Sequence, residues 1–318
     1  MVIRDIVDIA DLDCIYLSYD EPQKEEFWLK IKNMVPWAKR VDGVKGSDAA
    51  HKAAGEASDT ERFILIDGDN MPNESFFNIQ LDFTKVDSIF KVAQFRWKAV
   101  NHINGLRYGN GGMSSWTKEY VADMKTHENQ NDGDITRIAD FCMDSRDSLY
   151  WAMYDCYSTT YPNYTPFQAW RAGFREGVKM CLVYGDRPSV AEFKLIVATR
   201  NLNNLTIWHN IGLDVENGIW AIYGARLGTY MTLLTDWEHT NVQWFDNYPQ
   251  LWNQYCEGKD PNILAEEVGV ELENRLGLPI CTYNAEQSKF FKRHYNADKH
   301  NLGPLVREMD VIRKIEGW

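Results

Sequence analysis

The stretch ERFILIDGDN, residues 61–70, decides the fold that this sequence predicts. Its apolar run FILI is followed at once by Asp67, Gly68 and Asp69. A short apolar run that ends in turn-forming residues is typical of a strand that is buried on both faces. Ligands of parallel α/β sheets bind beyond the carboxyl ends of the strands, so the two aspartates stand at a predicted binding position.

Strand and helix patterns alternate in the residues that precede this stretch. The predicted strands are CIYLSY (14–19) and AKRVDG (38–43), and the predicted helices are QKEEFWLKIKNM (23–34) and AAHKAAGEA (49–57), the second capped by Ser47 or Asp48. This βαβαβ order predicts a parallel sheet that is covered by helices. The residues just after Tyr19 and Gly43 are therefore further predicted binding positions.

The patterns change after residue 85. Residues 86–100 favour strands, whereas residues 166–183, 189–202 and 218–237 have apolar residues at helical spacing. The sequence contains no repeat, low-complexity segment or linker rich in Pro, Gly or Ser. We therefore predict one continuous α/β body whose C-terminal third is mainly helical.

The chain of 318 residues is acidic, with 34 Lys and Arg against 46 Asp and Glu and a net charge of -12. A protein that coats nucleic acid is excluded, because a polyphosphate would be repelled. The segment KFFKRHYNADKH (289–300) is nonetheless locally basic, as either a solvated helix face or a contact for phosphates.

Apolar runs, the charge of the N-terminus and the cysteine spacing indicate the cellular compartment in which the protein is expected. No apolar run approaches the roughly 18 residues of a membrane span, and the N-terminus is acidic where a signal peptide would be basic. The six cysteines are widely spaced and form no CxxC pattern. We therefore expect a soluble protein of a reducing cytoplasm that does not enter a membrane.

Asp67 and Asp69 have the chemistry of a divalent cation site. Two carboxylates one residue apart, with Gly68 permitting the turn, can bind a cation that also takes phosphate oxygens. A plain turn would use the same residues, but the position after a buried strand favours the cation. An EF-hand loop beginning at Asp67 is excluded, because its last ligand position is Asn78 instead of Glu.

Three segments carry a resemblance to a known family: AAHKAAGEASDTERFILIDGDNMPNESFF (49–77), AVNHINGLRYGNGGMSSW (99–116) and FQAWRAGFREGVKM (167–180). The first resembles GT-A glycosyltransferases, whose DxD motif binds a metal and the diphosphate of a nucleotide sugar. Together the three resemble the GT-A-type enzymes of tailed bacteriophages. The resemblance implies a Rossmann-like sheet with a mainly helical C-terminal part, divided into residues 1–235 and a helical, acceptor-binding extension at 236–318.

The same resemblance assigns roles to residues near the motif. Asp69 would be the direct metal ligand, and Asp67 would contact the ribose or reach the metal through water. The other implied donor-site residues are Tyr19 and Asp20 near the nucleobase, Arg40, Lys45 and His51 beside the base or diphosphate, and Gly111 and Gly112 along the donor sugar. Ordinary surface charges and turn chemistry are the alternative explanation for these residues.

An inverting transfer also needs a carboxylate base for the acceptor hydroxyl. Glu176 is the first candidate, with Asp155 and Asp144 as alternatives. Arg171 and Arg175 lie on the same predicted helix and would pair with phosphate or with a neighbouring acid. In a retaining enzyme no such base is required, and Glu176 would position the sugar.

Enzymes of this family often take a third metal ligand late in the chain, frequently a histidine. His209 is the first candidate for that role and His239 the second. A lone histidine is more often structural than ligating, which is the alternative for both.

The resemblance thus implies a glycosyltransferase that uses Mn²⁺ or Mg²⁺ and a UDP-sugar donor, with 5-hydroxymethylcytosine in phage DNA as acceptor, in the host cytoplasm. Lys289, Lys292, Arg293 and Lys299 would contact DNA phosphates, and Trp116, Trp151 or Tyr161 would stack on a flipped base. The alternatives are a glycan, lipid or protein acceptor, a non-catalytic nucleotide-sugar binder, and a phosphatase or nucleotidyltransferase. The sugar, the stereochemistry and the oligomeric state stay open.

Overall fold

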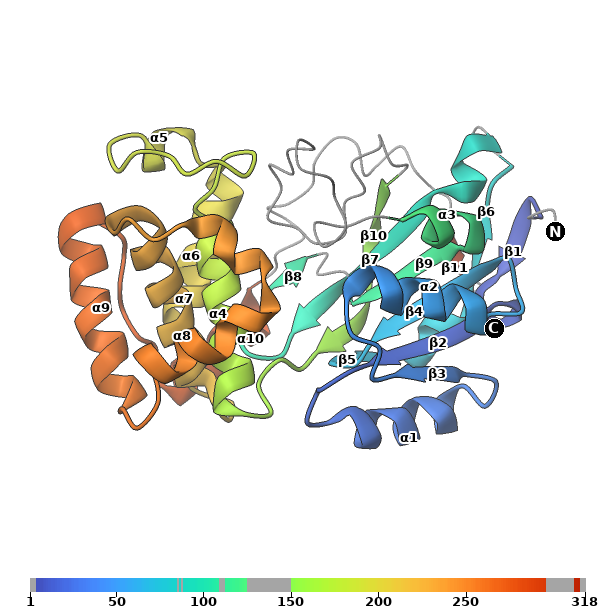
Figure 1. Ribbon diagram of the computed structural model, residues 1–318, viewed down its shortest axis with the longest axis horizontal. Coiled ribbons are helices and arrows are strands. Elements are labelled where there is room, and N and C mark those ends of the chain that lie inside the picture. Colours follow the sequence, from blue (N-terminus) through green and yellow to red (C-terminus); the bar gives the residue numbers. More distant parts are fainter. Residues whose placement is uncertain are drawn as a thin grey trace.

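The computed structural model describes residues 4–84, 86, 88–108, 112–124, 150–295 and 312–314. Within these residues a mixed eight-stranded sheet lies on one side of the molecule, and most of the helices after residue 165 lie on the other (Figure 1). The prediction of an α/β protein with a mainly helical C-terminal part is confirmed for the described residues.

The first half of the sheet is parallel. β2 (Asp13–Ser18) pairs with β3 (Lys39–Asp42) on one side and with β4 (Arg62–Asp67) on the other. α1 (Lys24–Met34) and α2 (Ser47–Ala57) connect these strands, as the alternating sequence pattern predicts. The cap of α2 differs from the prediction: it is Gly46, whose φ of 95° suits glycine.

Beyond β4 the sheet becomes mixed. β9 (Met113–Thr117) runs antiparallel to both β4 and β7 (Gln94–Asn101), and β10 (Tyr150–Thr160) runs parallel to β7. β5 (Asn70–Pro72) and β8 (Arg107–Tyr108) are added antiparallel to β10 and β7. A second, three-stranded sheet consists of β1 (Ile6–Asp8), β6 (Ile79–Asp82) and β11 (Ile312–Lys314).

Both faces of the parallel strands are buried, which explains the uninterrupted FILI run. Ile64 and Ile66 of β4 face a core that α1 covers through Phe27 and Ile31. Phe63 and Leu65 of β4 point to the opposite face, under α2 and α3 (Lys118–Asp123). Alternate residues of one strand thus belong to two separate cores.

The helical part contains α4 (Pro166–Lys179), α5 (Phe193–Ile196), α6 (Thr199–Asn210), α7 (Gly218–Leu234), α8 (Tyr248–Tyr255), α9 (Pro261–Leu276) and α10 (Ala285–His294). The single helix expected over residues 189–202 is wrong, because the chain turns between α5 and α6. Residues 86–100 combine a 3-10 turn, η3 (Ser88–Val92), with β7. No helix among the described residues combines the length and apolarity needed to cross a bilayer.

The hydrophobic clusters also place α4 with the later helices. One cluster joins Trp170 and Phe174 of α4 to Tyr223 of α7, Tyr248 of α8 and Ala265 of α9. The predicted boundary at residue 235 therefore cuts through a packed group of helices, and α4 begins that group.

Candidate functional site

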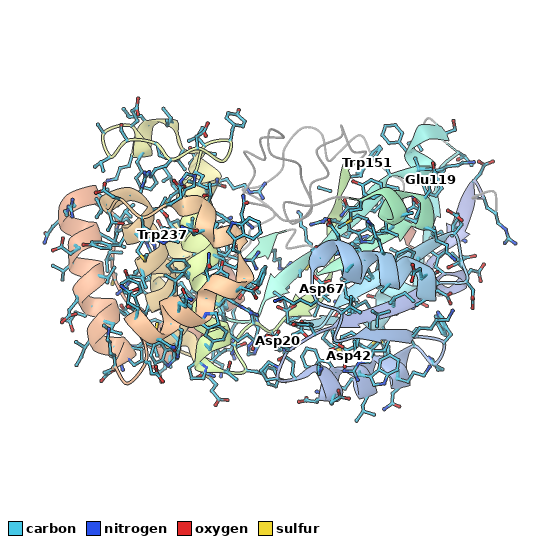
Figure 2. All side chains as sticks on the ribbon, viewed as in Figure 1. Asp20, Asp42, Asp67, Glu119, Trp151 and Trp237 are labelled. Carbon is cyan, nitrogen blue, oxygen red and sulfur yellow. The ribbon has the colours of Figure 1, made fainter. Side chains whose placement is uncertain are left out.

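The carboxyl ends of β2 and β4 meet beside the helical part, and Asp20 and Asp67 lie there in Figure 2. The Asp67 N–H donates to the carbonyl of Gly112 at 2.9 Å, and the Tyr161 N–H donates to the carbonyl of Asp69 at 2.8 Å. The Thr160 hydroxyl lies 3.2 Å from the Asp69 carboxylate and donates to it. The turn that carries both aspartates is therefore held by the segment before β9 and by the end of β10.

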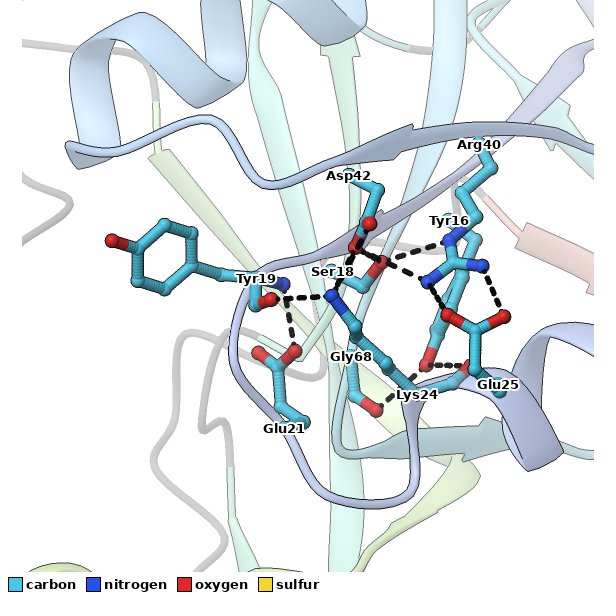
Figure 3. Close-up of polar contacts among 9 residues, drawn as sticks. All are labelled: Tyr16, Ser18, Tyr19, Glu21, Lys24, Glu25, Arg40, Asp42 and Gly68. Atoms are coloured by element: carbon cyan, nitrogen blue, oxygen red, sulfur yellow. Dashed lines mark hydrogen bonds and ion pairs between the residues drawn. The ribbon is translucent and has the colours of Figure 1, made fainter.

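Glu21 is a third acid of this site, and no motif in the sequence indicates it. Its carboxylate accepts the N–H of Tyr19 at 2.7 Å and lies directly against Gly68 (Figure 3). A Cβ at residue 68 would overlap that carboxylate. The position of Glu21 just after a parallel strand was the only available signal, because its contact with Gly68 forms only when both loops are folded.

Burial raises the pKa of all three acids, and the charges of neighbouring acids add to the shift for Asp67 and Glu21. Burial, with the neighbouring charges of Asp69 and Glu21, raises the pKa of Asp67 to about 8, although Arg96 opposes the shift. Burial also raises the pKa of Asp69 and of Glu21. The charges of Asp69 and Glu21 add negative potential around Asp67, and a negative potential favours a bound cation.

The charges of two arginines of α4 act on this acidic turn, and their role toward phosphate stays a prediction. Burial lowers the pKa of Arg171, while the charges of Asp20 and Asp69 act against that shift. Arg175 likewise acts on Asp69 and favours its ionised form. The site therefore combines acids of the sheet with guanidinium groups of the helical part, an arrangement that suits a cation and a phosphate together.

Arg40 has a different role from the predicted one. Its guanidinium donates to both oxygens of Glu25 at 2.7 and 2.8 Å, to Ser18 at 3.0 Å and to Asp42 at 3.1 Å. Lys24 donates to Asp42 and to the carbonyl of Tyr19 (Figure 3). This network uses the donors of Arg40 to fix the loop after β2, which corrects its prediction as a base or diphosphate contact.

The predictions for His51 and His209 are wrong. His51 is buried in α2, where Nδ1 lies 2.8 Å from the carbonyl of Ser47 and the ring packs on Trp116. His209 is buried at the end of α6, with Nε2 3.0 Å from the hydroxyl of Thr229. Burial lowers the pKa of His51 to about 4 and that of His209 to about 3. Both are core residues. His239 lies with Nε2 2.9 Å from the carbonyl of Gly185 and Nδ1 3.3 Å from the carboxylate of Glu238, and its role as a metal ligand stays a prediction.

The other predicted site residues have different outcomes. Glu176 pairs with Lys179 at 3.5 Å within α4, so its role as base stays a prediction. Five residues of β10, roughly 15 Å, separate Asp155 from Thr160, and its role as a base stays a prediction. Lys45 is exposed and pairs with Asp246 at 3.0 Å. Gly111, Asp144 and Lys299 lie outside the described residues.

Some of the aromatic and basic residues predicted to contact DNA are buried or paired, and others are exposed. Trp116 and Trp151 are buried core residues and cannot stack on a base. Tyr161 is half-buried against His102, at 4.6 Å between ring centroids. Lys292 forms an ion pair with Asp214 at 2.6 Å, which corrects its prediction as a phosphate contact. Lys289 and Arg293 of α10 remain exposed.

Asp67 and Asp69 are the described residues that could supply oxygen ligands to Mg²⁺ or Mn²⁺. Within the described ranges no three His, Cys, Asp or Glu side chains are grouped closely enough to hold a metal ion. Asp67 and Asp69 can suffice, because Mg²⁺ is commonly held by one or two carboxylates, with phosphate oxygens and water completing its shell. Asn70, which lies opposite Thr160 in the β5–β10 ladder, adds a buried amide without a hydrogen-bond partner in the described structure.

The chain matches no protein-family model, and no curated protein matches it in sequence.

Proposed function

We propose that this protein is a metal-dependent glycosyltransferase that takes a sugar from a nucleoside-diphosphate sugar, with UDP-sugar as the first donor to test. The observation that carries the proposal is that Asp67 and Asp69 lie at the end of β4 with Glu21 against Gly68 between them, while the charges of Arg171 and Arg175 act on Asp69. Acids that hold a cation, facing guanidinium groups, suit a diphosphate leaving group. The resemblance of the DxD segment to GT-A enzymes supports the same chemistry.

Each group would have a distinct task. Asp67 and Asp69 would supply oxygen ligands, and Arg171 and Arg175 would donate hydrogen bonds to the diphosphate. A bound divalent cation would neutralise negative charge that develops on the departing diphosphate. Tyr19, which is 44% exposed at the end of β2, offers a ring face for the nucleobase. Glu176 is the proposed base if the enzyme inverts configuration.

For the acceptor we propose DNA that carries 5-hydroxymethylated pyrimidines. The support is a groove of about 620 Å³ along α10, lined by aromatic residues that include Phe290, Phe291 and Tyr295. Lys289 and Arg293 are exposed on the same helix and offer charges to a phosphate backbone. The net charge of -12 favours the second candidate, a transferase of the same chemistry with a glycan, lipid or protein acceptor.

The test is release of nucleoside diphosphate from a panel of sugar nucleotides with Mn²⁺, with and without DNA that contains 5-hydroxymethylcytosine. We expect release that this DNA stimulates, with a mass gain of one sugar on the base. Release that ignores the DNA would favour the other acceptors. Absence of release with every donor would contradict the proposed enzyme and favour a binding protein.

Asp69→Asn provides the matched variant. We expect it to reduce turnover by about a hundredfold or more, because it removes a charged oxygen that stabilises the departing diphosphate, while its circular dichroism spectrum is unchanged. Asp59→Asn is the control, since the Asp59 side chain is 91% exposed and pairs only with Lys39 among the contacts of the described residues. Equal turnover by the two variants would contradict the assignment of Asp69.

A further inference from the structure

We propose that Phe245 is a positioning residue of the donor site, whose ring holds Arg171 and Arg175 side by side for the diphosphate. This inference rests on the proposed function and adds a residue that the sequence analysis did not identify. Phe245 begins the 3-10 turn η6 (Phe245–Asn247), far from α4 in sequence.

The contacts of the ring are the first argument. The guanidinium carbon of Arg171 lies 5.5 Å from the Phe245 ring centroid, and that of Arg175 lies 5.0 Å from it. Arg171 also lies over Phe167, at 5.6 Å. A cation over an aromatic face is attracted by the ring quadrupole, so Phe245 attracts both guanidinium groups at once.

The need for such a ring is the second argument. Arg171 and Arg175 are one helical turn apart on α4 and carry like charges, which repel each other. Both side chains are long and would otherwise spread over many rotamers. A shared aromatic face offsets the repulsion and restricts the rotamers. Phe245 thereby preorganises the two guanidinium groups as an anion site, whose charges also act on Asp69.

The anchoring of η6 is the third argument. Next to Phe245, Asp246 pairs with Lys45 of the β3–α2 connection at 3.0 Å. Phe245 itself packs edge-on against Tyr248, with 5.7 Å between ring centroids. The turn therefore contacts the sheet part on one side and the helical part on the other, and its ring is set between the two parts that form the donor site.

Arg171 and Arg175 together suit a diphosphate ligand, because two neighbouring guanidinium groups match two neighbouring phosphate groups. Inorganic pyrophosphate with Mn²⁺ is the simplest probe, since it tests diphosphate binding by Arg171 and Arg175 without assuming a nucleobase or a sugar. Calorimetry would measure its affinity for the intact chain and for single variants.

We expect Phe245→Leu to weaken pyrophosphate binding by about tenfold, because both cation–π contacts are lost while an apolar side chain remains. Phe245→Tyr should bind within about threefold of the natural chain, since it restores the ring. Trp244→Leu is the matched control: Trp244 is the preceding residue and is 46% exposed, and its loss should leave affinity unchanged. Melting temperatures verify folding, and Phe245→Met replaces the leucine variant if that variant is unstable.

Three results would overturn the inference while leaving the proposed function in place: Phe245→Leu binds as well as the natural chain, Phe245→Tyr fails to restore binding, or Trp244→Leu loses as much affinity. Failure of the natural chain itself to bind pyrophosphate with Mn²⁺ would instead overturn the donor site on which the inference rests. The two failures are therefore distinguishable in one set of measurements.

Discussion

His51 and His209 make the native state sensitive to acid. Burial lowers the pKa of His51 to about 4 and that of His209 to about 3. Below the ordinary histidine pKa of about 6.5, the unfolded chain binds protons that the native chain does not. Their contribution to stability is therefore complete above pH 6.5 and is lost progressively as the pH falls toward the native values.

A single substitution checks this prediction. We expect His51→Gln to flatten the decline of the unfolding free energy between about pH 6.5 and 4, by an amount on the order of 3 kcal/mol. Glutamine does not titrate and can still donate to the carbonyl of Ser47. Urea titrations over this pH range measure the effect, and His294→Gln, on the exposed end of α10, is the control. Equal pH slopes for His51→Gln and the natural chain would contradict the prediction.

At the scale of elements, α4 and α7 approach so closely that their glycines are required. A Cβ on Gly173 or Gly177 of α4 would overlap a backbone carbonyl of α7, and a Cβ on Gly224 or Gly228 of α7 would overlap one of α4. The obstacles are main-chain atoms of a packed helix, which cannot rotate away. Because α4 also carries Arg171, this contact determines where the arginines of the site lie.

We expect Gly177→Ala to lower the free energy of unfolding by about 2 kcal/mol, since the overlap outweighs the gain in helix propensity. Gly55→Ala in α2 is the comparison variant. Its Cβ would meet a side-chain methyl of Val121 at 2.6 Å, whereas no main-chain atom outside α2 would lie closer than 4.0 Å. Denaturation in urea should therefore show a smaller loss for Gly55→Ala than for Gly177→Ala. A stabilised Gly177→Ala variant would show that the helices can separate at little cost.

At the scale of the whole molecule, Lys292 connects α10 to earlier segments of the chain through an ion pair and hydrogen bonds. It pairs with Asp214 at 2.6 Å, with the two side chains 17% and 10% exposed, and donates to the carbonyls of His102 and Ile103. His102 in turn packs on Tyr161, whose N–H donates to Asp69. The C-terminal helix is thus connected to the candidate site through three successive contacts.

We expect Lys292→Met to lower the free energy of unfolding by about 3 kcal/mol, because it leaves the Asp214 carboxylate buried without its partner. Lys289→Met, one turn earlier on the exposed face of α10, should change stability by less than about 0.5 kcal/mol. Thermal and urea unfolding compare the two variants. Similar losses in both would show that the Lys292–Asp214 pair adds nothing beyond surface charge.

Local patterns in the sequence determined the parallel core of the sheet and the place of Asp67 and Asp69 at the end of β4. An apolar run, a helical spacing and a turn are set by neighbouring residues, so β2, β3, β4, α1 and α4 were predictable, as was the position of Asp67 and Asp69 at a strand end. The mixed half of the sheet was not, because the direction in which β9 pairs depends on a partner strand far away in sequence.

Only the tertiary structure decided which charged residues share the site. It placed Glu21 against Gly68 and Arg171 near Asp69, and it buried His209 and Lys292 among other partners. Charge and residue type alone do not distinguish these outcomes. Whether a titratable side chain meets a ligand, a salt-bridge partner or a hydrophobic core depends on contacts between distant segments, and those contacts form only when the chain folds.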